Sequence, residues 1–262
     1  MKTLIKLTLV LCFLGFNSLY SQEYTHDVKS AKKIEISNLT GDIKIVGQSG
    51  SSLLIETSDT YELPERAKGL KPLSGGGEDN TNLGLNISEV GGVISVKGAT
   101  KQSSDSDYTF TVPNNIAVFV DYSSPFTADD VEVENFGGEF EMKGLNDGVK
   151  LKDITGPVFL DLINGDIEII FTSVNQESPM SIQTINGEID VTMPSATKAN
   201  FELSSLHGDI YSDLDIEVKK DKDKDDDMDF FGGSTNVEGN LNGGGVKMDI
   251  SSINGNIYLR KK

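Results

Sequence analysis

The chain has 262 residues, a formal net charge of −18 at pH 7 and one cysteine. A surface this acidic repels nucleic-acid phosphates and anionic membranes, so the composition excludes nucleic-acid binding and favours cations or basic partners. The cysteine, Cys12, lies in an N-terminal apolar segment that we expect to be removed, which excludes disulfides, thiolate metal sites and cysteine nucleophiles from the mature chain.

Residues 1–21 have the pattern of an export signal. Lys2 and Lys6 give a basic start, and the stretch LTLVLCFLGF that follows is apolar and uncharged but too short to remain as a membrane span. We therefore expect Gln22 to begin the mature protein, with no integral membrane segment after the signal is removed. The expected location is periplasmic, outer-membrane-associated or extracellular.

From residue 22 onward the apolar segments are short, and apolar and polar residues alternate in steps of two, which is typical of half-buried β-strands. These segments are KKIEISN (32–38), DIKIVG (42–47), LLIETS (53–58), YTFTV (108–112), IAVFVDY (116–122), VEVEN (131–135), EFEMKG (139–144), VFLDL (158–162), DIEII (166–170) and EIDVTM (188–193). Residues 58–82, 101–107 and 219–245 break the pattern with Pro, Gly and charge. We predict one all-β domain over residues 22–262, with loop insertions at 58–82 and 219–245.

A glycine with one apolar residue two places before it and another two places after it recurs along the chain. The steps from Gly165 to Gly187 and from Gly187 to Gly208 are 22 and 21 residues, which is the size of one coil in a repeat protein. The clearest copies are Leu39/Gly41/Ile43, Ile163/Gly165/Ile167, Ile185/Gly187/Ile189, Leu206/Gly208/Ile210 and Ile253/Gly255/Ile257.

Two architectures can produce this repeat. Asn-Gly is a strong signal for a two-residue hairpin, and a set of such hairpins would form an antiparallel β-sandwich. Hairpins would leave Ile163, Ile185, Leu206 and Ile253 on the wrong face, whereas in a β-solenoid the apolar residues on both sides of a corner can face one core. We favour the single-domain β-solenoid, with the sandwich of hairpins as the alternative. Its corners would need positive φ, which glycine adopts without steric cost.

The chain also resembles a known family. The stretches that carry the resemblance are IEISNLTGDIKIVG, YTFTVPNNIAVFVDYSS, and the run from GPVFLDLINGDIEII to SSLHGDI. They are similar to the bacterial family of exported β-strand-repeat proteins named "putative adhesins", over roughly residues 30–260. The resemblance implies a fold of repeated β-strands. It implies no activity, because the family is a domain of unknown function without a catalytic motif.

The residue after the corner glycine is acidic in several copies. If the coils stack in register, equivalent side chains lie about 4.8 Å apart, and carboxylates at that distance repel each other unless a cation relieves them. Calcium is the natural candidate because it accepts several oxygen ligands in flexible geometry. The competing interpretation is that each acid is solvated separately at an exposed corner. The candidate ligands are Asp166, Glu188 and Asp209, with Asn256 at the equivalent place and Asp42 and Glu139 as further candidates.

The residue before the glycine is Asn164, Asn186, His207 or Asn254. This column predicts a ladder of side-chain hydrogen bonds, and it makes His207 a turn residue before it is a catalytic base.

No hydrolase, metalloprotease or nucleotide-binding motif occurs in the sequence. We expect a non-catalytic binding or structural role in the cell envelope or outside the cell, with an unknown protein or glycan partner. A calcium-binding structural rod is the alternative, and a polysaccharide-acting β-helix enzyme is less favoured.

Overall fold

The structure is a computed structural model that describes residues 22–59, 62, 64–70, 73, 76–101, 105–123, 130–219 and 235–262. The expected export signal lies outside the described residues, as do parts of the expected loops. The described chain is built from β-strands, so the prediction of an all-β fold is confirmed. The strands are β1 (Gln22–Asp27), β2 (Lys33–Ser37), β3 (Ile43–Gln48), β4 (Ser52–Thr57), β5 (Leu85–Val90), β6 (Val93–Gly98), β7 (Tyr108–Pro113), β8 (Ala117–Tyr122), β9 (Val131–Glu134), β10 (Phe140–Gly144), β11 (Val149–Ile154), β12 (Val158–Asn164), β13 (Ile167–Phe171), β14 (Met180–Asn186), β15 (Ile189–Met193), β16 (Ala199–Ser205), β17 (Ile210–Ser212), β18 (Ile216–Val218), β19 (Thr235–Leu241), β20 (Val246–Asn254) and β21 (Ile257–Lys261).

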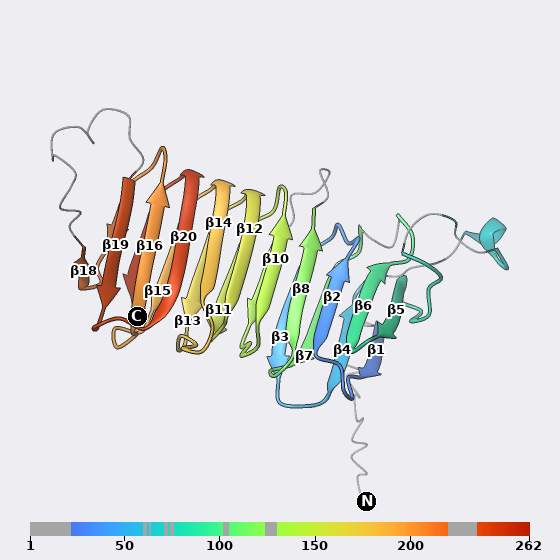
Figure 1. Cartoon of the computed structure of the whole chain (residues 1–262). Coiled ribbons are helices and arrows are strands. Elements are labelled where there is room, and N and C mark those ends of the chain that lie inside the picture. Colours follow the sequence, from blue (N-terminus) through green and yellow to red (C-terminus); the bar gives the residue numbers. More distant parts are fainter. Residues whose placement is uncertain are drawn as a thin grey trace, which may run out of the picture.

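The strands form two mixed sheets that lie face to face along one axis (Figure 1). The ten-stranded sheet has the order β1-β4-β7-β3-β9-β11-β13-β15-β21-β17. The eleven-stranded sheet has the order β18-β19-β16-β20-β14-β12-β10-β8-β2-β6-β5. Neither sheet closes on itself, so each has two edge strands.

The Asn-Gly turns connect the two sheets. β12 and β13, on either side of Gly165, lie in different sheets. β12 instead pairs in parallel with β14, and β13 pairs in parallel with β15, so each strand lies beside its counterpart from the next repeat. These turns therefore do not close hairpins.

The core lies between the sheets and follows from the period-two alternation. Leu160 pairs with Ile182, and Ile182 pairs with Ile250, so that equivalent side chains stack along the axis. The side chains of Ile182 and Ile250 are fully buried, as are those of Ile189 and Ile257 from the opposite sheet. Burial of such continuous apolar columns is the main force that holds the sheets together.

The order of repeats in space differs from the order in sequence. β20 lies between β14 and β16, and β21 lies between β15 and β17. The repeat that contains Gly255 is therefore inserted between the repeats of Gly187 and Gly208. β19 makes this possible because it runs antiparallel to β16. It brings the chain back to the edge of the sheet where β16 begins, and from there β20 can run between β14 and β16.

The expectation that the apolar residues before the glycines face the core is wrong. Ile163, Ile185, Leu206 and Ile253 are 39%, 39%, 46% and 41% exposed. The alternation of β12 holds as far as Ile163, so the residue two before the glycine points outward, and Asn164 after it is exposed as well. The inward position one residue earlier is filled by Leu162 or, in the later repeats, by a small buried hydroxyl residue such as Thr184.

The reason proposed for the corner glycines is also wrong. Gly165, Gly187, Gly208 and Gly255 are absent from the residues with positive φ. They are needed because the backbones of neighbouring repeats approach closely at the corner: a Cβ on Gly187 would lie 2.0 Å from the carbonyl oxygen of Gly165, and one on Gly255 would lie 1.9 Å from that of Gly187. Only glycine fits such a stack of backbones.

The loop expected at 219–245 needs a correction as well. Thr235–Leu241 forms β19, whose residues Val237, Gly239 and Leu241 pair with β16. Residues 220–234 of that range lie outside the described part of the chain. In the other expected loop, between β4 and β5, a 3-10 turn spans Glu65–Ala67.

Candidate binding surface on the ten-stranded sheet

The acidic column after the corner glycines has a structural use. Asp166 Oδ1 accepts a hydrogen bond from the backbone N–H of Glu188 at 2.8 Å. Asn256 Oδ1 does the same for the N–H of Asp209 at 2.9 Å, and Asp107 Oδ1 accepts from the N–H of Asp42 at 2.9 Å. A side-chain oxygen at this position thus satisfies a backbone donor of the adjacent repeat at the point where the ladder of a sheet begins.

The predicted cation ligands are not consecutive in space. Asn256 lies between Glu188 and Asp209, because the repeat of Gly255 is inserted there. Glu139, the further candidate, belongs to the opposite corner, where its backbone oxygen accepts a hydrogen bond from Val118. No group of three or more His, Cys, Asp or Glu residues placed to hold a metal ion occurs among the described residues. Calcium binding by Asp166, Glu188 and Asp209 stays a prediction.

The predicted asparagine ladder is present at the same corner. Asn164 Nδ2 donates to Asn146 Oδ1 at 2.8 Å, Asn186 Nδ2 donates to Asn164 Oδ1 at 2.7 Å, and Asn254 Nδ2 donates to Asn186 Oδ1 at 2.7 Å. His207 follows Asn254 in the stack, where its backbone N–H donates to the oxygen of Ile253. The interpretation of His207 as a turn residue agrees with this place.

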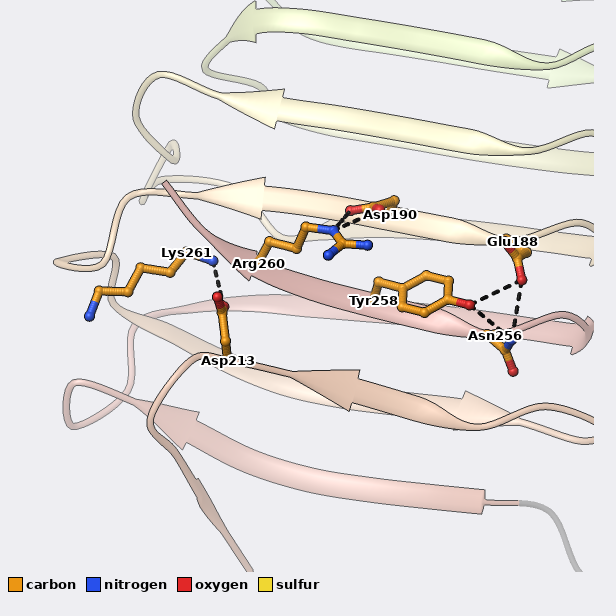
Figure 2. A network of polar contacts seen from close by, with 7 residues as sticks. All are labelled: Glu188, Asp190, Asp213, Asn256, Tyr258, Arg260 and Lys261. Carbon is orange, nitrogen blue, oxygen red and sulfur yellow. Dashed lines mark hydrogen bonds and ion pairs between the residues drawn. The ribbon is translucent and has the colours of Figure 1, made fainter.

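Outward-facing side chains of β15 and β21 form a connected polar network near the C-terminal end of the ten-stranded sheet (Figure 2). The Tyr258 hydroxyl donates to Glu188 Oε1 at 3.2 Å. Asn256 Nδ2 lies 3.0 Å from the Tyr258 oxygen and 3.1 Å from Glu188 Oε1. These bonds hold the Tyr258 ring in one orientation on the outer face.

Arg260 belongs to the same face. Its Nε donates to both carboxylate oxygens of Asp190, at 2.9 and 2.8 Å, and its guanidinium lies 5.3 Å from the centre of the Tyr258 ring. The hydrogen bond to Asp190 raises the pKa of Arg260 above its ordinary value. The arginine is thus charged, oriented and paired beside an aromatic ring.

A second tyrosine extends this surface. The ring of Tyr211 on β17 stacks on that of Tyr258, with centres 5.6 Å apart and planes inclined by 13°. The Tyr211 hydroxyl donates to Asp209 Oδ2 at 3.1 Å, and this hydrogen bond raises the pKa of Tyr211. Tyr211 is 51% exposed although its ring is fixed on one side. We call Tyr211, Tyr258 and Arg260 the aromatic platform.

The N-terminal half of the same sheet carries a groove of about 680 Å³, lined by Asp42, Lys44, Glu56, Asp107, Asp130 and Glu132 among others. Lysines from neighbouring strands offset part of its charge. Lys44 Nζ lies 3.1 Å from Glu134, and Lys150 donates a hydrogen bond to Asp130 that raises the pKa of Lys150. The groove is therefore a mixed-charge surface.

Sequence reasoning missed the aromatic platform, although a signal for it existed. Tyr258 and Tyr211 each follow the apolar residue two places after a corner glycine, in NGNIYL and HGDIYS. Alternation places both tyrosines on the outer face, and the register pairs them directly. Arg260 then joins them because it lies two residues after Tyr258 on the same strand.

Comparisons with known proteins leave the family open. No protein-family model matches the chain, and no curated protein matches it. Among solved structures, the chain is similar to one described as a "putative cell adhesion protein" from Clostridium sporogenes, with a TM-score of 0.45 and 10% identity over 92% of this chain and 99% of that one. It is also similar to a "putative adhesin" from Bacteroides fragilis, with a TM-score of 0.45 and 12% identity over 92% of this chain and 97% of that one. At this similarity, conclusions about function depend on the residues of the chain itself.

Proposed function

We propose that the protein is an exported β-solenoid with a non-catalytic binding role in the cell envelope or outside the cell. The solenoid interpretation is supported by the alternation of the chain between two sheets and by the parallel pairing of equivalent strands. Stacked coils of this kind make a stiff body with flat outer faces, which is a suitable support for presenting side chains to a partner.

The aromatic platform carries the binding role. Tyr211 exposes aromatic surface on a flat sheet and is supported by the stacked ring of Tyr258, where burial against another strand would be the ordinary use of such side chains. The carboxylates around them are each occupied: Asp190 by Arg260, Glu188 by Tyr258, and Asp209 by Tyr211. Carboxylates held in this way fix a surface in place, which fits recognition better than proton transfer.

Export is the second part of the proposal. Its support is the basic and apolar pattern of residues 1–21. Across the part of the chain that the structure describes, no helix is long and apolar enough to cross a membrane.

Cell fractionation combined with a binding assay tests the proposal. Antibodies against the purified chain 22–262 should detect the protein in the periplasm, on the outer membrane or in the medium, and labelled protein should bind isolated envelope material or whole cells. A double variant, Tyr211→Ala with Arg260→Ala, should bind less than the native protein, while Val90→Ala, at an exposed residue of β5, serves as the control. A cytoplasmic location, or envelope binding that the double variant leaves unchanged, would overturn the proposal.

A further inference from the structure

The aromatic platform has one free ring face. Tyr258 is covered on one side by Arg260 and on the other by Tyr211. Among the described residues, Tyr211 is covered by Tyr258 on one side only, and β17, which carries it, is the last strand of the ten-stranded sheet. Its second face is therefore directed away from the stack, which agrees with its exposure of 51%.

This free face is held rigid before any ligand arrives. The hydroxyl of Tyr211 is anchored on Asp209, and the ring rests on a second ring that is itself anchored by Glu188 and Asn256. A ligand that stacks on Tyr211 would lose little free energy to the ordering of the protein, because the side chain is already ordered.

The acidic surroundings of the free face of Tyr211 favour ligands whose hydroxyl groups donate hydrogen bonds. Asp209 accepts a hydrogen bond from the Tyr211 hydroxyl through Oδ2 and has a second carboxylate oxygen beside it, whereas Asp213, past the other end of β17, is directed at the backbone N–H of Lys261 on β21 (Figure 2). Carboxylates accept hydrogen bonds from ligand hydroxyls and repel ligand anions. The nearby cation, Arg260, is already paired with Asp190.

We propose that the aromatic platform binds a neutral sugar residue of a glycan. The apolar C–H face of a pyranose ring stacks on the electron-rich face of Tyr211, and a hydroxyl at the ring edge donates to Asp209. The net charge of the chain and the Asp209 carboxylate reject acidic polysaccharides. This inference rests on the proposed binding role and names the class of ligand.

Titration with soluble oligosaccharides tests the inference. The probes are neutral gluco-, manno-, galacto- and xylo-oligosaccharides, with oligogalacturonate as the acidic comparison. Because the chain contains no tryptophan, tyrosine fluorescence reports binding without a tryptophan background, and saturation-transfer NMR on the sugar gives an independent measurement. At least one neutral oligosaccharide should bind the native chain more tightly than oligogalacturonate does. Tyr211→Ala should weaken that binding about tenfold or more, which is the size expected when an aromatic stacking partner is lost.

The controls separate stacking from folding. Tyr211→Phe keeps the ring face and should retain most of the affinity, and Val90→Ala should match the native protein. Absence of binding by every neutral probe, or equal affinity of the native and Tyr211→Ala proteins, would overturn the inference. If Tyr211→Ala instead abolishes binding to an envelope protein while no sugar binds, the glycan assignment falls and the proposed binding role stands.

Discussion

At the scale of single residues, the corner of each repeat is fixed by backbone approach. The carbonyl oxygens of Gly165, Gly187 and Gly255 each lie where a side chain on the next corner glycine of the stack would be. A buried hydroxyl accompanies it: Thr184 Oγ1 donates to the oxygen of Gly165 at 3.2 Å, and Ser252 Oγ donates to the oxygen of Gly187 at 3.0 Å. The missing side chain of glycine leaves room for the carbonyl group, and the hydroxyl gives that group a hydrogen-bond partner.

Replacement of a corner glycine should be costly. Gly187→Ala places a Cβ 2.0 Å from a backbone oxygen, and we expect the free energy of unfolding to fall by about 2 kcal/mol or more. Gly50→Ala is the matched control, since its nearest atom would be 3.6 Å away in the flexible side chain of Gln48. That change should be neutral or stabilise by about 0.5 kcal/mol through the unfolded state. Urea unfolding of the two variants would contradict this account if both changed stability equally.

The ionisation of Tyr211 is a second property of one residue. Its hydrogen bond to Asp209 raises its pKa, so the contribution of this contact to stability is present below the ordinary tyrosine pKa and is lost as the pH rises through the raised pKa. Asp209→Asn should therefore lower the pKa of Tyr211, which NMR titration of the tyrosine ring carbons measures. Asp213→Asn should leave it unchanged, because Asp213 accepts from the backbone of Lys261 instead.

At the scale of elements, columns of like residues link neighbouring repeats. The asparagine ladder joins β12, β14 and β20 on one side of the corner. On the other side of the corner, Asp166 and Asn256 each bind a backbone N–H just before the first residue of a strand in the ten-stranded sheet. Because Asn256 performs the same hydrogen bond as Asp166, the structure needs an oxygen acceptor in this column rather than a charge.

Substitution of Asp166 separates the hydrogen-bond role from a cation site. Asp166→Asn keeps the acceptor and should leave stability nearly unchanged, whereas Asp166→Ala removes it and should lower the free energy of unfolding by about 1 kcal/mol. Thermal unfolding with and without calcium checks the alternative. A rise of the melting temperature in calcium that Asp166→Asn abolishes would support the cation ladder.

Local patterns in the sequence predict the strands and the asparagine ladder, because period-two alternation and the spacing of Gly165 and Gly187 are local information. They do not predict that Ile163 faces solvent, since the strand continues to Asn164 before the corner begins. Local patterns also do not predict the order of the repeats in space. It depends on pairing of β20 with β14 and β16, which are distant in sequence and have nearly identical patterns.

At the scale of the whole molecule, the C-terminal strands are internal. β20 and β21 join β14 and β15 to β16 and β17, and Ile250 and Ile257 are fully buried. β1 has the opposite character: it is an edge strand, pairs with β4, and contains no buried residue.

Truncation should therefore have unequal effects at the two ends. Removal of residues 246–262 leaves β16 and β17 without their parallel partners, and we expect limited proteolysis to cleave within residues 199–218. Removal of Gln22–Asp27 should leave the remaining coils protected. Equal resistance of the two truncated proteins would show that the inserted coil does not hold the neighbouring coils together.

The insertion of the Gly255 repeat also affects the order in which the strands can pair during folding. As the polypeptide emerges from the ribosome, β16 and β17 become available before β20 and β21 exist. Their sequences are similar enough to those of the later strands that they could pair directly with β14 and β15. β20 and β21 would then be excluded from their native places between these strands. Reaching the native arrangement requires the earlier pair to remain apart or to be displaced, so maturation is expected to include a slow rearrangement near this end.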